Sequence, residues 1–391
     1  MTEAKAGSMS PLSRTEYVQA IVERYRKAGR QEKQRILDEF CRICGYHRKH
    51  AIRTLSQTAN RPKSARRKPG RASRYNKPEI LEVLRCIWSC AHYPCSKRLK
   101  AILGAWVEPY EQTFGPLASW VKAAVAKISP ATIDRLLTQA RLRVQRKGLS
   151  TTKPGTLLKH HIPVQTNQWD ETRPGFLEAD TVAHCDASMA GQFVFSLDVT
   201  DIATGWTEQR AIWGKGERGV LEQLVSIEAA LPFPLLGFDC DNGTEFLQWP
   251  LVRSFQERAH PVQFTRSRPY KKDDNAHVEQ KNWTHVRQWL GYQRFEHAPI
   301  VELLNDLYTT EWRLLHHFFL PSAKLQSKQR IRSKIIKVHD DPQTPYQRLL
   351  DSPHIPQPTK ARLAALYHTL NPFSLRKAID AKIAPIRRLG R

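Results

Sequence analysis

Three acidic residues in the middle of the chain have the type and setting needed for metal-dependent chemistry. Asp180 lies in the extended stretch GFLEADTVAHC, Asp241 ends another in PLLGFDCDNGTEF, and Glu279 lies where a helical pattern begins in DDNAHVEQKNW. They are 61 and 38 residues apart, so no local motif joins them. Two-metal phosphoryl transfer uses carboxylates from separate elements, because divalent ions prefer hard oxygen ligands and keep positions open for water and phosphate. The three residues are therefore candidate ligands for two Mg²⁺ or Mn²⁺ ions.

Other acidic residues that could compete for this role lie nearby in the sequence: Asp198, Asp201, Asp239, Asp273 and Asp274. Capping of turns or exposure to solvent explains carboxylates in such positions without a catalytic role. His184 would share a strand face with Asp180 and could approach phosphate or metal there. We favour a structural role for this histidine.

A sheet and its covering helices must position these side chains. After Pro174 the period of the sequence changes, and residues 175–185, 192–201 and 205–215 read as three consecutive strands with turn residues between them. Helices and short strands then alternate, with helices predicted at 218–231, 247–259, 276–295 and 299–319. This order predicts an α/β fold over residues 165–320, with a mixed sheet covered by helices on both faces.

An Asp in the first strand, Asp-Asn-Gly after the fourth and Asn-x-x-x-Glu opening a helix resemble a known catalytic core. It is the Asp-Asp-Glu (DDE) core of retroviral integrases and integrase-type bacterial insertion-sequence transposases. The resemblance implies a ribonuclease-H-like fold in which Asp180, Asp241 and Glu279 are the catalytic metal ligands. It also implies supporting roles for the turn residues Asn242 and Gly243 and for Asn275, which precedes the catalytic helix.

The sequence departs from that family at one point. Retroviral relatives carry Lys residues one and two turns after the Glu, where they contact DNA, whereas this chain has Trp283 and Val286. Lys281 and Arg287 are the candidates to replace that contact.

The charge of the chain is strongly uneven. The 62 Lys and Arg residues outnumber the 37 Asp and Glu residues and give a net charge of +25. Residues 1–164 carry +22, residues 165–320 carry −8, and residues 321–391 carry +11. Basic flanks around an acidic centre fit an enzyme that grips a phosphate backbone, although a basic binding protein with an ordinary acidic domain would have the same balance.

The N-terminal 1–59 segment has the pattern of a helix-turn-helix domain. Gly45 falls in the turn of CRICGYHRKHAIRTLSQ, and Arg48, Lys49 and Arg53 lie on the following helix, where a reader of the major groove carries its contacts. A plain helical hairpin with a basic surface is the alternative.

Three further segments complete the expected organisation. Residues 60–77 hold eight basic residues and no acidic one, which predicts a linker that lies on DNA through Arg66, Arg67, Lys68 and Arg71 or else a solvated tether. Residues 78–150 predict a second helical, helix-turn-helix-like DNA-binding domain, and residues 148–165 a boundary. Residues 321–391 predict a small basic β/α module that binds DNA, with strand-like alternation around Ile331 and Ile335.

Cysteines and histidines gather in two places, at Cys41, Cys44, His47 and His50 and at Cys86, Cys90, His92 and Cys95. Four ligands within ten residues would be cramped around zinc, so buried helical thiols beside basic surface histidines are the better interpretation. No apolar run approaches the length of a membrane span and no secretory signal begins the chain. We therefore expect a cytoplasmic, nucleoid-associated protein with reduced thiols and no membrane partner.

Together these observations predict a transposase. It would bind double-stranded DNA at the ends of an insertion element and at a target, act as a homo-oligomer in the DNA complex, and catalyse metal-dependent 3′-end cleavage and strand transfer. The alternatives are a nuclease or resolvase with the same core, or a non-catalytic DNA-binding regulator derived from a transposase.

Overall fold

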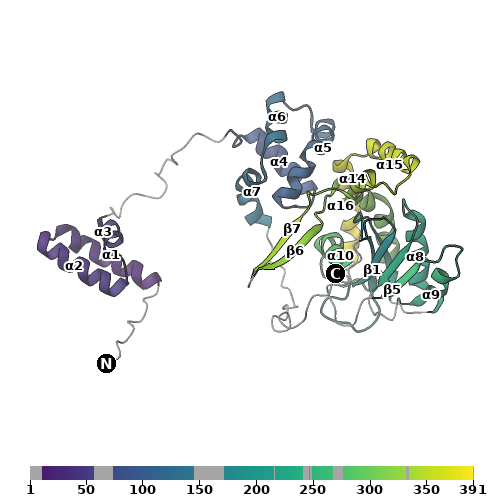
Figure 1. The fold of residues 1–391 in the computed structure, drawn as a ribbon, viewed down its shortest axis with the longest axis horizontal. Helices are drawn as coiled ribbons and strands as arrows, with labels where there is room; N and C mark the ends of the chain where they lie inside the picture. Colours follow the sequence, from purple (N-terminus) through teal and green to yellow (C-terminus); the bar gives the residue numbers. More distant parts are fainter. Residues whose placement is uncertain are drawn as a thin grey trace. The chain divides into compact units, whose positions relative to one another are not determined.

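The structure is a computed structural model that describes residues 11–56, 74–144, 171–214, 216–240, 246, 249–266, 276–331 and 334–390 (Figure 1). The chain forms two compact units, Met1–Ala72 and Ser73–Arg391. Within the described ranges, every helix is either too short or too polar to cross a membrane.

The first unit contains helices α1 (Pro11–Lys27), α2 (Arg30–Cys44) and α3 (Arg48–Ser56). Their apolar faces form one small core: Val22, Tyr25, Ile36, Leu37, Phe40, Cys44, Ala51 and Leu55. Phe40 is fully buried and stacks on Tyr17, with ring centroids 5.9 Å apart. Gly45 ends α2 at a φ of 68°, a left-handed conformation that favours glycine. The predicted helices with Gly45 in the turn are confirmed.

The exposed side of α3 carries the predicted cations. Arg48, Lys49 and Arg53 are all exposed, while Ala51 and Leu55 face the core. Arg48 forms an ion pair with Asp38 of α2, so its guanidinium is partly neutralised within the unit. Lys49 and Arg53 therefore present their charge more openly than Arg48.

The second unit is mixed α/β and is built around a five-stranded sheet of order β3-β2-β1-β4-β5. The strands are β1 (Phe176–Ala183), β2 (Val194–Asp201), β3 (Thr207–Trp213), β4 (Gly237–Cys240) and β5 (Gln263–Arg266). β1 pairs with β2, and β2 with β3, in antiparallel fashion, whereas β4 and β5 run parallel to β1. The predicted mixed sheet is confirmed, and β1 is its central strand.

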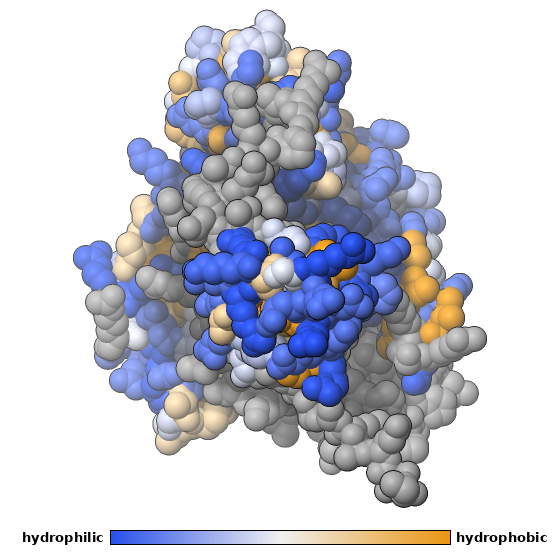
Figure 2. Space-filling view, turned by 90° about the vertical axis from the view of Figure 1, so that its left-hand side faces the viewer, coloured by the Kyte–Doolittle hydropathy of each residue, from blue (hydrophilic) through white to orange (hydrophobic). Residues whose placement is uncertain are grey.

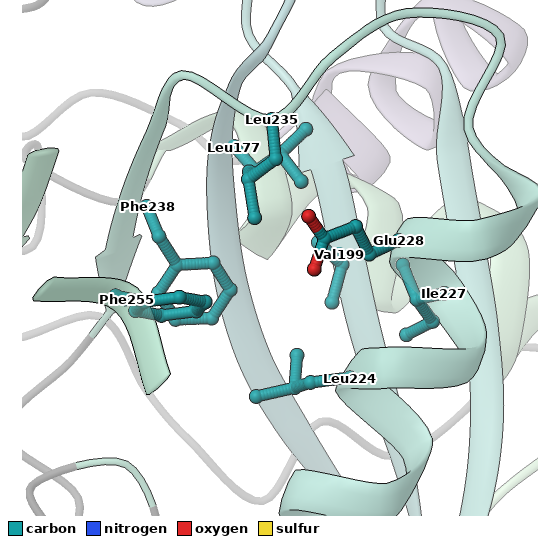
Figure 3. A pocket seen from close by; sticks show the side chains of 8 residues that line it. All are labelled: Leu177, Val199, Leu224, Ile227, Glu228, Leu235, Phe238 and Phe255. Atoms are coloured by element: carbon teal, nitrogen blue, oxygen red, sulfur yellow. The ribbon is translucent and has the colours of Figure 1, made fainter. Parts of the chain in front are cut away.

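The two faces of this sheet differ in chemistry because side chains alternate along each strand. On one face, Leu177 and Phe238 pack against Leu224 of α8 (Glu217–Ala230) and Phe255 of α9 (Trp249–Gln256) (Figure 3). Val199, Ile227, Glu228 and Leu235 complete the lining of this small apolar pocket. The opposite face of β1 carries Glu178 and Asp180.

The helical segment that carries Glu279 lies on that opposite face. It comprises α10 (Ala276–Lys281), a π-helical segment η2 (Asn282–Arg287) and α11 (Gln288–Leu290), and α10 contacts both β1 and β2. The helix predicted at 276–295 thus ends at residue 290, before Gly291 at a φ of 78°. Short π-helical segments occur often near functional sites, because the extra residue per turn changes which side chains face inward.

The remaining helices belong to the same unit, and some of them contact β3 directly while others pack on other helices. They are α4 (Pro78–Cys90), α5 (Ser96–Phe114), α6 (Ser119–Lys127), α7 (Pro130–Val144), α12 (Pro299–Leu307), η3 (Tyr308–Trp312), α13 (Arg313–Phe319), α14 (Pro345–Asp351), α15 (Gln357–Thr369) and α16 (Pro372–Leu389). Trp106 of α5 lies edge-on to Phe319 of α13 and Phe373 of α16, with centroids 6.1 and 5.3 Å apart. The segments 78–150 and 321–391 therefore share one core with residues 165–320.

A two-stranded antiparallel ribbon, β6 (Leu325–Ile331) and β7 (Lys334–His339), interrupts the C-terminal helices. This confirms the predicted strand pattern around Ile331 and Ile335.

The separate cores allow the two units to be destabilised one at a time. Phe40→Ala removes a fully buried ring from the first unit, and we expect this to cost about 3–5 kcal/mol of that unit's stability. All ten tryptophans of the sequence lie after residue 72, so tryptophan fluorescence reports only the second unit. Its urea transition should not move in Phe40→Ala, while amide exchange in residues 11–56 accelerates. A matching shift of the tryptophan transition would contradict independent cores.

Candidate functional site

Asp180 lies at the middle of the acidic sheet face, and its carboxylate is held by two donors. Oδ2 accepts a hydrogen bond from Asn282 Nδ2 at 2.6 Å, and Oδ1 accepts one from the Thr181 backbone N–H at 2.7 Å. Asn282 begins η2, so this contact joins the central strand to the helix that carries Glu279. The carboxylate is partly exposed, so it remains accessible to a ligand from solvent.

Glu178 fixes the start of that helix. Its Oε2 accepts hydrogen bonds from the backbone N–H groups of His277 and Val278, both at 3.0 Å. These are donors of the first turn of α10, which lack partners within the helix. Burial raises the pKa of Glu178 to about 8, and the negative charges of Asp239 and Glu279 add to the rise, while the two N–H donors oppose it. Glu279 follows directly and is exposed on α10.

Asp198 lies opposite Asp180 in the register of β1 and β2. It is completely buried, which raises its pKa to about 8; the charge of Asp180 contributes to the rise, and Gln209 and Lys281 oppose it. The expectation of turn capping or solvation is therefore wrong for Asp198, because helices cover both faces of β2. The same expectation is confirmed for Asp201, whose Oδ2 accepts the N–H and Oγ1–H of Thr204.

Asp239 is also buried rather than solvated. It pairs with Glu178 in the register of β1 and β4, and its Oδ1 accepts a hydrogen bond from Thr265 Oγ1 of β5 at 2.7 Å. This contact links the last two strands of the sheet.

Part of the predicted site lies outside the described residues: Asp241, Asn242, Gly243, Asn275, Asp273 and Asp274. β4 ends at Cys240, which pairs with Ala179 of β1, so the end of β4 lies beside Asp180. Within the described ranges, no three Asp, Glu, His or Cys side chains form a group that could hold a metal ion. The described part contains two of the three predicted ligands, Asp180 and Glu279.

The structure corrects the predicted DNA contacts on this helix. Lys281 is 6% exposed, and its Nζ donates to the backbone carbonyl of Gly205 at 3.2 Å, so the ammonium faces the interior instead of the surface. Burial lowers the pKa of Lys281 to about 7. Arg287 is half-buried, donates to the Ala183 carbonyl at 2.6 Å and lies over the Tyr292 ring. Both cations support the fold around the site, whereas Trp283 is 51% exposed.

His184 has the structural role favoured for it. The ring is fully buried and stacked on Phe295, and Nε2 lies 2.8 Å from Ser196 Oγ. Ser196 Oγ in turn lies 2.7 Å from the Tyr308 hydroxyl. Burial, followed by the charge of Arg287, lowers the pKa of His184 to about 3.

Sequence reasoning missed two residues that organise the site. Glu178 could have been found, because the strand period of two places it on the same face as Asp180. Asn282 gave no such signal, since its contact with Asp180 joins residues that are 102 positions apart in the sequence.

One relative is similar over nearly the whole chain. The uncharacterized protein y4rM of Sinorhizobium fredii (strain NBRC 101917 / NGR234) is 39% identical over 347 residues, which cover 88% of this chain and 97% of that protein. The chain belongs to the same family. Because the second unit spans only residues 73–391, the shared region includes part of both units. No protein-family profile matches the sequence.

The role of Glu178 as the anchor of α10 can be tested by removing its acceptor. Glu178→Ala leaves two backbone N–H groups without their partner, and each buried unsatisfied donor costs about 1–3 kcal/mol. We expect the second unit to lose roughly 2–5 kcal/mol of stability, measured by urea unfolding with tryptophan fluorescence. Glu178→Gln keeps a carbonyl acceptor and should lose far less. Equal losses in the two variants would show that the helix contact does not carry the effect.

The buried neutral state of His184 makes stability depend on pH. The unfolded chain takes up a proton near pH 6.5, whereas folded His184 stays neutral down to about pH 3. Its stabilising contribution is therefore lost as pH falls through this window, by about 1.4 kcal/mol per pH unit.

The stability difference between wild type and His184→Gln should consequently shrink by about 2 kcal/mol from pH 7 to pH 5. His297→Gln, an exposed substitution, is the matched control and should leave the pH dependence unchanged. A constant difference for His184→Gln would mean that the ring is protonated in the folded chain.

Proposed function

We propose that this chain is a metal-dependent DNA transposase of the integrase type, which binds the ends of an insertion element and catalyses 3′-end cleavage and strand transfer. One observation carries the proposal: a half-buried carboxylate on the central strand of a mixed sheet lies beside the end of β4 and beneath a helix that presents Glu279. The sheet order and strand directions are compatible with a ribonuclease-H-like core. The position of this carboxylate and the topology of the sheet both fit the resemblance to the DDE core drawn from the sequence.

The donor set suits hard divalent cations. Asp180, Asp241 and Glu279 would hold two Mg²⁺ or Mn²⁺ ions, since all three offer carboxylate oxygens and none is replaced by a soft ligand. The bound ions supply activation of water, and then of a DNA 3′-hydroxyl, for in-line attack on a phosphodiester. Asn282 keeps the Asp180 carboxylate in one orientation, and Glu178 keeps the start of α10 over β1, so the described part of the site is held by contacts within the protein.

The basic surfaces support a DNA partner. Lys49 and Arg53 are exposed on α3, and the predicted linker contacts Arg66, Arg67, Lys68 and Arg71 lie outside the described residues. In Figure 2, hydrophilic side chains predominate on the coloured part of the face shown, with apolar ones in small separate patches. Such a surface disfavours an apolar partner, and the net charge of +25 favours a polyanion. Action on two DNA ends calls for a homo-oligomer in the DNA complex.

A nuclease or resolvase with the same core is the second candidate. It would share the carboxylates but would not join a DNA end to a target, so the formation of joined products separates the two. A non-catalytic regulator would have no need for all three carboxylates, and the sequence retains them.

Removing one metal-ligand charge should separate chemistry from binding. We expect Asp180→Asn, Asp241→Asn and Glu279→Gln each to reduce cleavage and strand transfer by at least about 100-fold, because several kcal/mol of transition-state stabilisation is lost. Binding to terminal DNA should stay within about twofold, since the basic flanks are unchanged. The measurement is a strand-transfer assay with labelled terminal DNA and Mg²⁺.

Asp186→Asn, an exposed substitution after β1 with the same change in charge, is the matched control and should keep full activity. Wild-type strand transfer by any one of the three variants would remove that residue from the site. Cleavage by the wild type without joined products would favour the nuclease.

A further inference from the structure

The β6–β7 ribbon is fixed at its base and exposed along its length. Ser322 and Gln343 exchange two backbone hydrogen bonds of 2.9 and 3.1 Å below the strands. Asp340 accepts the backbone N–H of Lys324 and forms an ion pair with Arg348 of 2.7 Å. Beyond this base, every described side chain of the two strands is exposed, and Figure 1 shows the two strands as one antiparallel ribbon. The ribbon is therefore anchored at its base, and its described side chains remain exposed.

The register of the ribbon divides its residues between two faces. Ser327 pairs with Val338, Gln329 with Ile336 and Ile331 with Lys334, so these six residues lie on one face, which we call the Gln329 face. Lys328 pairs with Lys337 and Arg330 with Ile335 on the other, cationic face. Three of the four cations in these pairs therefore lie on the cationic face, and the fourth, Lys334, is on the Gln329 face.

An isolated two-stranded ribbon in water is marginally stable. Here it also exposes apolar side chains on the Gln329 face, with Ile336 46% and Val338 47% exposed. Apolar groups grouped on a projecting element indicate a contact surface for a partner.

The charge of the ribbon distinguishes between two possible partners, a second copy of the ribbon and a nucleic acid. Residues 325–339 contain five Lys and Arg residues and no Asp or Glu. A second copy of the ribbon would bring the same positive charge and be repelled, whereas a nucleic acid is complementary to it.

We propose that the β6–β7 ribbon lies in the major groove of DNA, with the Gln329 face against the base edges. The major groove admits a two-stranded ribbon, Gln matches the donor and acceptor pattern of adenine, and apolar side chains contact the methyl group of thymine. The long side chains of Lys328, Arg330 and Lys337 reach from the opposite face to the phosphates on either side of the groove. The ribbon is thus a sequence-reading element separate from α3. This inference rests on the DNA partner of the proposed function and is independent of its chemistry.

Substitutions on the two faces should weaken DNA binding in two different ways. In the full-length chain, Lys328→Gln and Lys337→Gln should each weaken binding to every duplex and reduce the slope of log affinity against log salt by about one. Gln329→Ala should leave the salt slope unchanged. It should weaken binding by roughly 5- to 100-fold only on duplexes selected by the wild type, and relax the preference for adenine at one position.

The probe is a pool of DNA duplexes of random sequence, from which the duplexes bound by the wild type are recovered and sequenced. Affinities are then measured for selected and unselected duplexes at several salt concentrations. Lys377→Gln on α16 and Gln256→Ala on α9 are exposed matched controls and should behave as wild type. Tryptophan fluorescence checks that each variant is folded.

The outcomes separate a failure of the ribbon proposal from a failure of the proposed function. Unchanged affinity and base preference in the ribbon variants, with wild-type binding intact, would overturn the inference alone. A change of oligomeric state in Ile336→Ser with unaltered DNA binding would overturn it in favour of a second copy. If the variants on both faces lose DNA affinity as predicted but the wild type cleaves no DNA, the ribbon proposal is supported and the transposase proposal is refuted.

Discussion

The candidate site depends on one contact, between the Glu178 carboxylate and the first backbone N–H groups of α10. Both hydrogen bonds are 3.0 Å long and connect the central strand to the start of the helix that carries Glu279. A helix N-terminus attracts negative charge, because its first N–H groups point outward without partners. Glu178 satisfies them from the sheet side, while Glu279 lies on the exposed side of the same helix. The Asn282 contact with Asp180 then fixes the next turn.

This arrangement concentrates acidic groups in a small volume. Burial raises the pKa of both Glu178 and Asp198 to about 8, and neighbouring carboxylates add to each rise. Lys281 is the buried cation that opposes the effect at Asp198. The predicted surface role of Lys281 was wrong because its Nζ reaches inward and donates to the backbone carbonyl of Gly205. Fixed N–H donors and one ammonium thus offset a cluster of carboxylates that would otherwise repel one another.

Local patterns predicted much of the fold because they reflect contacts within single elements. Alternation in residues 175–185 identified β1, and Gly45 marked the end of α2 because a positive φ requires such a residue. The burial of Asp198 could not be predicted, since it depends on which helices cover β2. The packing of Trp106 against Phe319 and Phe373 joins segments more than 200 residues apart, and no local pattern records such a contact.

The turn between β2 and β3 connects the acidic face to the ribbon. Asp201 shapes this turn by accepting hydrogen bonds from Gly175 and Thr204. The carbonyl of Gly205 accepts Lys281 Nζ from α10, while the carbonyl of Ala203 accepts Lys324 Nζ from the base of the ribbon, at 2.9 Å. A side chain at residue 205 would meet both Lys281 and Ser322, and the φ of 72° at this position favours glycine. Helix α10 and the base of the ribbon therefore contact the same turn, so a duplex held by the ribbon as proposed would have a defined position relative to Glu279.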